Sequence, residues 1–206
     1  MAKKEVPLHH LAQYLPDNTY ESVIAYLNFY KVHLTIARSR KSVLGDYRHK
    51  WGSANHRISV NGNLNRYAFL ITLLHELAHL ITFEQYGNRV QAHGKEWKNI
   101  YARLLAQFIE KKIFPVDIEY ELLKSLRNPG ASSCAEEDLQ RVLYDYNERK
   151  DGYTLLERLP AGALFQIYDG RVFQKGNKRT KRYNCVEIAT NKVYLFSGVY
   201  EVLPVR

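Results

Sequence analysis

The residues best suited to chemistry in this 206-residue chain are two histidines and a glutamate in the pattern H-E-x-x-H, formed by His75, Glu76 and His79. Residues four apart lie on one face of a helix, so both imidazoles can reach one metal ion. The glutamate beside the first histidine can then hold a water molecule that the metal activates. The pattern therefore predicts a metal centre with a general base beside it.

The motif lies in the middle of an apolar run that predicts a buried helix over residues 66–86. Apolar residues continue on both sides of the motif without Gly or Pro. Asn65 is the expected N-cap, and Gly87 is the expected stop. Burying two histidines and a carboxylate without partners is costly, and a metal ion is the simplest partner for all three. The alternative is a pair of core histidines satisfied by hydrogen bonds.

A catalytic zinc site needs a third protein ligand, and the chain offers His93 and Glu96. The spacing of a metzincin is excluded, because Thr82 and Gln85 stand where that class needs Gly and His. Gly94 would let the backbone approach closely after His93, as the next helix begins. Because imidazole is the commonest ligand type, we favour His93 and keep Glu96 as the alternative.

Four motifs in the N-terminal half occur together in one order. They are L-G-D-Y-R at residues 44–48, H-R-I-S-V-N at 56–61, L-H-E-L-A-H at 74–79 and H-G-K-E-W-K at 93–98. With them, residues 15 to 112 resemble the SprT-like zinc metalloprotease family, which includes a protease of DNA–protein crosslinks. The resemblance implies that His75, His79 and His93 bind one catalytic Zn²⁺ and that Glu76 is the catalytic base.

The same resemblance implies that the strand at residues 57–61 aligns a substrate backbone beside the metal by strand addition. Tyr47 and Arg48 are candidates for the oxyanion stabiliser from their position alone. Many bacterial members carry a cysteine-rich zinc ribbon after the protease domain. This chain has only Cys134 and Cys185, which cannot form a four-cysteine site, so we expect no such ribbon in this sequence.

The pattern of apolar residues predicts an α+β fold for the N-terminal half. A small three-stranded sheet is expected to pack on helices that include the motif helix. Its helices are expected at residues 17–30, 66–86 and 94–113, and its strands at 32–37, 42–48 and 57–61. We expect this metalloprotease domain to span residues 1–114. A helical connector should follow over residues 115–150, with one helix at 118–126 and a second that begins with a capping box at residues 133–136 and runs to about residue 149.

From residue 151 to 206 the pattern changes to period two, which is typical of strands. Strands are expected at residues 163–168, 171–175, 183–188, 192–196 and 199–203. Asp169-Gly170 is a strong hairpin signal between the first two. The segment therefore predicts a small all-β module, either a barrel of SH3-like or OB-like type or an open meander.

The net charge of +9 is spread unevenly. Residues 1–100 carry 13 Lys+Arg against 7 Asp+Glu, residues 101–150 carry 8 against 9, and residues 151–206 carry 9 against 5. Five cations gather in one segment of the β module: Lys175, Lys178, Arg179, Lys181 and Arg182. Flanked by Phe173 and Tyr183, they indicate a loop that contacts nucleic acid. The alternative is a solvated hairpin tip.

The loop at residues 47–56 contains two histidines, a tryptophan and two basic residues. We interpret it either as a rim for substrate or DNA near the cleft, or as a solvated loop anchored by its tryptophan. No apolar run reaches 18 residues, and the N-terminus lacks the core of a signal peptide. Two distant cysteines fit a reducing compartment. We therefore expect a cytoplasmic protein without membrane contact.

These observations predict a zinc-dependent endopeptidase that acts on protein substrates associated with DNA or crosslinked to it. The alternative is a DNA-binding protein whose zinc site is structural or vestigial and which cleaves nothing. A glutamate beside the first histidine favours the protease, because a structural site needs no base.

Overall fold

The computed structural model describes residues 8–40, 43–52, 54–126, 130, 134, 136–148 and 152–205. The chain divides into two compact units, one that ends at Asn147 and one that begins at Glu148. The predicted boundary between residues 150 and 151 lies outside the described residues. Each unit has its own core, so the two are described separately. Among the described residues, no helix is both long and apolar enough to cross a bilayer.

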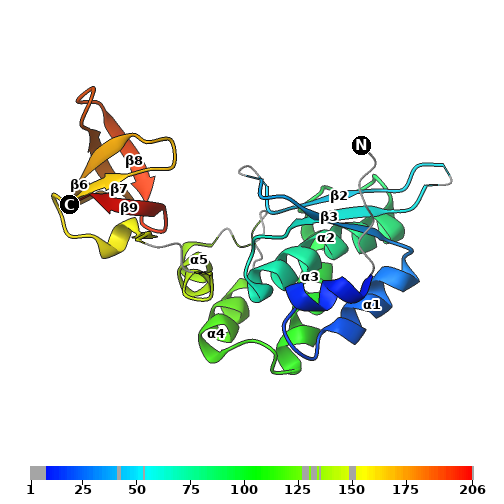
Figure 1. Cartoon of the computed structure of the whole chain (residues 1–206). Coiled ribbons are helices and arrows are strands. Elements are labelled where there is room, and N and C mark those ends of the chain that lie inside the picture. Colours follow the sequence, from blue (N-terminus) through cyan, green and yellow to red (C-terminus); the bar gives the residue numbers. More distant parts are fainter. Residues whose placement is uncertain are drawn as a thin grey trace. The chain divides into compact units, whose positions relative to one another are not determined.

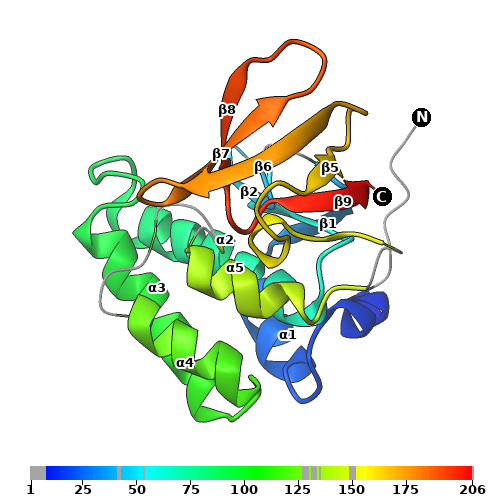
Figure 2. The same cartoon turned by 90° about the vertical axis from the view of Figure 1, so that its left-hand side faces the viewer.

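The first unit is the mixed α+β structure that the sequence predicts, with its helices on one side of a short sheet (Figure 1). In chain order the elements are a 3-10 helix (Leu8–Tyr14), α1 (Tyr20–Phe29), β1 (His33–Ala37), β2 (Gly45–Arg48), β3 (Arg57–Asn61), α2 (Arg66–Tyr86), α3 (Lys95–Glu110), α4 (Val116–Ser125) and α5 (Glu137–Tyr144). Helix α2 packs against α3, as Figure 2 shows, and α4 packs against α5.

The three strands have the order β1-β3-β2, so β3 is the central strand. It pairs in parallel with β1, where His33 lies opposite Arg57, and antiparallel with β2, where Tyr47 lies opposite Ile58. Because both edges of β3 are occupied, it cannot accept a further strand. The expectation that residues 57–61 align a substrate is therefore wrong. Within the described residues, β2 pairs on one side alone and presents the free edge that faces away from β3.

Helix α2 is buried along most of its length, because its sequence is apolar on every side instead of along one stripe. Both predicted ends are confirmed. The side chain of Asn65 accepts a hydrogen bond from the backbone N–H of Ala68 at 2.9 Å, and its amide donates to the carbonyl of Leu143. Gly87 ends the helix with a φ of 61°, a conformation that glycine adopts without strain.

Helices α3 and α5 end several residues before their predicted ends. Helix α3 ends at Glu110 instead of residue 113, and Lys112 then takes a left-handed conformation with a φ of 56°. Pro115 precedes α4 as its N-cap residue. Helix α5 ends at Tyr144, where the next N–H groups bond to carbonyls three residues back, and the predicted end at residue 149 lies outside the described residues.

The second unit is a six-stranded antiparallel sheet with the order β4-β9-β5-β6-β7-β8. Its strands are β4 (Thr154–Leu155), β5 (Leu164–Gln166), β6 (Val172–Lys178), β7 (Arg182–Glu187), β8 (Val193–Ser197) and β9 (Glu201–Val205), with a 3-10 helix at Leu156–Arg158. In the described part of this unit the outer strands β4 and β8 do not pair, so the sheet is open; because β9 lies between β4 and β5 instead of beside β8, it is not a simple meander either. Phe165, Phe173 and Val202 are buried in its core.

The predicted hairpin is present, and the β module contains a second one. Strands β5 and β6 pair across Asp169-Gly170, where Gly170 has a φ of 88°, and β7 pairs with β8. Strand β6 is longer than predicted, because it continues to Lys178. The basic segment is therefore mostly strand, and residues 179–181 alone connect β6 to β7.

Candidate metal centre

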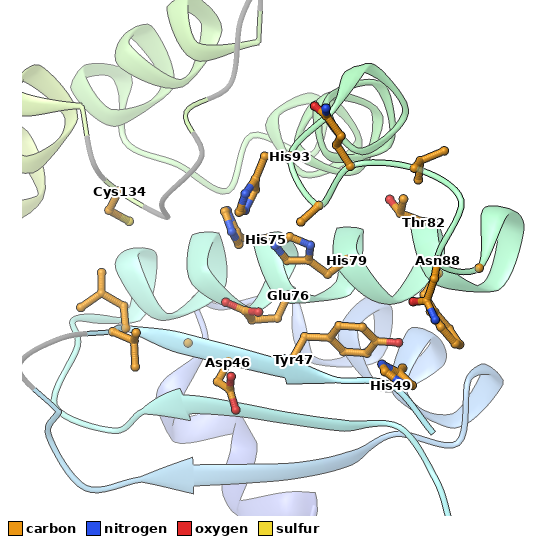
Figure 3. A pocket seen from close by; sticks show the side chains of 18 of the residues that line it. Asp46, Tyr47, His49, His75, Glu76, His79, Thr82, Asn88, His93 and Cys134 are labelled. Carbon is orange, nitrogen blue, oxygen red and sulfur yellow. The ribbon is translucent and has the colours of Figure 1, made fainter. Parts of the chain in front are cut away.

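Three histidines converge at the centre of the first unit. His75 and His79 lie on α2, one turn apart, and His93 precedes α3. One ring nitrogen from each lies within 4.8 Å of the others, and Figure 3 shows the three rings turned toward one another. Among the described residues this is the one group of His, Cys, Asp and Glu close enough to hold a metal ion. Glu96, the alternative third ligand, is not part of it.

Aromatic side chains of α3 pack against the three histidines. The fully buried indole of Trp97 lies 4.7, 5.2 and 4.8 Å, between ring centroids, from the rings of His75, His79 and His93. Tyr101, one turn later on α3, stacks on Trp97 at 5.0 Å. The sequence gives no sign that Trp97 contacts all three imidazoles. Packing against one rigid ring restricts how far the histidines can turn.

The donor set fits a metal ion. His75 Nδ1 and His93 Nε2 are buried and have no hydrogen-bond partner among the described atoms. A buried polar atom without a partner is costly, and a bound cation satisfies imidazole nitrogens that no protein group reaches. Neutral imidazoles at this spacing suit zinc, which takes three protein ligands in catalytic sites.

Burial keeps the histidines in the form that binds metals. Burial is the largest cause that lowers the pKa of His75 to about 3, with smaller contributions from His79 and His93. It also lowers the pKa of His79 to about 4 and that of His93 below its usual value. All three rings are therefore neutral at neutral pH, so protons do not compete with a metal for the nitrogens.

Glu76 lies between α2 and β2, beside the histidine cluster (Figure 3). Its side chain is buried, with 5 % exposed, and burial raises its pKa to about 8. The charge of Asp46 raises this pKa further, while Arg40 lowers it. A nearby dication would favour the carboxylate by Coulomb attraction. The residue thus has the environment of a proton-transferring group near neutral pH.

The family model described as SprT-like matches residues 10–119. The chain belongs to the SprT-like family. Neither a curated protein nor a solved structure matches the chain. Family membership indicates a metalloprotease-type domain, and the matched region contains the three histidines and Glu76.

The cluster of this SprT-like domain opens into a pocket of about 740 Å³. Its lining includes the histidines, Glu76, residues 43–47 around β2, and His49 of the following loop. Cys134 also contributes to the lining and is buried, which raises the pKa of its thiol to about 12. A reactive site that is reached by an open pocket can admit a large substrate.

A hydrogen-bonded chain fixes the start of the β2–β3 loop to α2. The hydroxyl of Tyr47 lies 2.9 Å from Nδ1 of the buried His56, whose Nε2 lies 3.2 Å from the Glu84 carboxylate. Burial lowers the pKa of His56, so the ring is neutral. With Nε2 donating to Glu84, Nδ1 accepts from Tyr47. Lys50 pairs with the same carboxylate at 2.9 Å.

Neither candidate for the oxyanion stabiliser donates toward the cluster. The proton of Tyr47 is engaged by His56, and Arg48 is exposed and bonds to Asp46 at 3.0 Å. In the same loop, His49 stacks on Phe83 at 4.6 Å and lines the pocket. Trp51 is 81 % exposed, so it does not anchor the loop as the solvated-loop interpretation supposed.

The predicted nucleic-acid residues separate into two groups. Lys178, Arg179, Lys181 and Arg182 are exposed around the β6–β7 connection. Lys175 is 5 % exposed, and its ammonium donates to the carbonyls of Glu157, at 3.2 Å, and Leu159. Its prediction as a nucleic-acid contact is therefore wrong. The period-two pattern contained the signal, because Lys175 follows the buried Phe173 on the inward face of β6.

Proposed function

We propose that this SprT-like protein is a zinc-dependent endopeptidase. The observation that supports it best is the convergence of His75, His79 and His93 within 4.8 Å, with Glu76 beside them in an open pocket. The three histidines would hold one zinc ion. Zinc, when bound, supplies a Lewis acid that lowers the pKa of a water molecule and polarises a scissile carbonyl.

The protein's own groups would orient the reactants and move the proton. The Glu76 carboxylate would accept a proton from the attacking water and deliver it to the leaving amine nitrogen. Trp97, which packs against all three imidazoles, would restrict their rotation. Burial of Glu76 strengthens its interactions with charge that develops in the transition state, because water screens them less.

A peptide substrate would lie along the free edge of β2. Residues 43–47 line the pocket, and the edge of β2 that faces away from β3 has no strand partner among the described residues. An extended peptide that adds to this edge would have its backbone hydrogen-bonded beside the histidine cluster. This places the substrate-aligning function on β2 instead of β3.

A DNA-binding protein with a structural or vestigial zinc site is the competing function. Structural zinc sites are closed by four protein ligands, whereas this cluster has three histidines at an open pocket. A buried carboxylate next to such a cluster has a use in hydrolysis and none in a structural site. These two features favour the protease.

The second unit would bring the protease to DNA. The exposed cations Lys178, Arg179, Lys181 and Arg182 are the part of the predicted basic segment that can reach phosphates. Lys178 also lies 5.7 Å above the ring of Tyr183, a half-buried aromatic residue at the base of the same hairpin. Phosphate contacts of this kind give affinity without sequence preference.

The Glu76→Gln variant tests the proposed function. It keeps the size of the side chain but removes the base, so we expect full zinc content and a loss of hydrolysis of at least about 100-fold. Zinc is measured by mass spectrometry and cleavage on an unfolded protein substrate, with and without a chelator. Glu21→Gln, an exposed position on α1, is the matched control and should cleave like the parent. Equal cleavage by Glu76→Gln and the parent would exclude this mechanism.

A further inference from the structure

Strand β2 lies with one face against the motif helix. Gly45 and Tyr47 are two residues apart on the strand, so both point to that face. Gly45 lies over Glu76 and Thr72, and the ring of Tyr47 lies parallel to that of His79, with 6.4 Å between centroids. The strand therefore covers both the proposed base and one of the three histidines.

Glu76 occupies the space that a side chain at position 45 would need. A Cβ atom at Gly45 would lie 2.5 Å from Glu76 Oε1, 2.9 Å from Glu76 Cγ and 2.7 Å from Thr72 Cγ2. Heavy atoms do not approach this closely unless something moves. Both neighbours are buried, with 5 % of Glu76 and none of Thr72 exposed. The methyl of an alanine would therefore displace the carboxylate or push the strand away.

The backbone gives no other reason for a glycine at this position. Gly45 is not among the glycines with positive φ, so its conformation is open to any residue. Other turns of the chain do need the left-handed region, as at Gly87 and Gly170. Position 45 differs from these turns, because the absence of a side chain there leaves space that Glu76 and Thr72 occupy.

We propose that Gly45 is a positioning residue, which fixes the carboxylate of Glu76 beside the histidine cluster by leaving it the space under β2. The inference rests on the proposed function in that Glu76 is the base. It also explains how an edge strand that aligns a substrate can lie directly on the catalytic helix. Because position 45 has no side chain, the Glu76 carboxylate fits between β2 and α2. A displaced carboxylate would no longer meet the substrate correctly, and misplacement by about 1 Å is enough to cost about 100-fold in rate.

A double-mutant cycle tests the contact without any need for activity. Gly45→Ala in the full chain should lower the melting temperature of the first unit by about 5 °C, as expected for overpacking of a buried site. In a Glu76→Ala background the Cγ and Oε1 atoms are gone and only the contact with Thr72 Cγ2 remains, so the loss should be smaller than in the parent. An equal loss in both backgrounds would show that Glu76 does not occupy the space and would overturn the proposal.

Kinetics test the effect on the reaction. Gly45→Ala should lower kcat by about 100-fold and leave KM and zinc content near those of the parent. Gly62→Ala is the matched control. Its new Cβ would lie 2.7 Å from Ile36 Cγ2, a crowded place that involves no residue of the site, with Tyr14 Cε1 and the Ala37 carbonyl oxygen farther away at 3.4 and 3.5 Å. It should lose stability and keep kcat, and an equal kcat for the two variants would overturn the proposal. If the parent itself cleaves nothing, the proposed function fails, and the double-mutant cycle still decides the contact.

Discussion

At the scale of single residues, burial sets the chemistry of the site more than ion pairing does. It is the largest cause of the lowered pKa values of the three histidines and of the raised pKa of Glu76. Both pKa shifts suit a metal centre with a general base. They keep the imidazoles free of protons at neutral pH, and they leave Glu76 with a proton affinity that a bound dication can adjust.

The third ligand can be tested residue by residue. His93→Ala should weaken zinc binding by more than about 100-fold, beyond the loss expected for residues that only support a ligand. The measurement is competition with a chromophoric chelator, and the fluorescence of Trp97, which contacts all three rings, reports the same event. Glu96→Ala is the control and should bind zinc like the parent. Full zinc binding by His93→Ala, or its loss in Glu96→Ala, would assign the third ligand differently.

At the scale of elements, local chemistry made α2 predictable, while pairing between distant segments did not. The Asn65 cap and the Gly87 stop act within one turn of the helix, so both ends of α2 can be predicted from the local sequence. The order β1-β3-β2 depends on contacts between segments that no local pattern specifies. For this reason the sequence does not show which strand is at the edge of the sheet, and it does not predict the approach of Gly45 to Glu76.

Strand addition at β2 predicts a period of two in the substrate. In a β pair, successive residues point their N–H groups alternately toward and away from the partner strand. Methylation of single backbone nitrogens in a peptide substrate should therefore raise KM at every second position and have little effect at the positions between, which serve as matched controls. Cleavage rates that fall evenly along the peptide, or do not fall, would contradict an added strand at this edge.

At the scale of the whole molecule, the proposed catalytic residues and the predicted nucleic-acid contacts belong to different units. The histidine cluster and Glu76 belong to the unit that ends at Asn147, and the exposed cations of the β6–β7 hairpin belong to the unit that begins at Glu148. A variant in one unit can thus test the contribution of that unit alone, since each unit has its own core.

Reversal of two charges at the hairpin should weaken DNA binding without changing the hydrolysis of a free peptide. In the full chain, Arg179→Glu with Lys181→Glu removes two cations that can contact phosphates, so the slope of log K against log salt should become shallower by about 2. Lys192→Glu, an exposed cation on the β7–β8 connection, is the control and should leave the slope unchanged. Lys175→Met should also leave it unchanged, because that ammonium already bonds to the carbonyls of Glu157 and Leu159.

A slope that stays the same after the double reversal would exclude the hairpin as the DNA contact. A parallel loss of peptide hydrolysis would instead show that the cations serve the protease unit, because phosphate contacts alone cannot alter the cleavage of a substrate that carries no DNA.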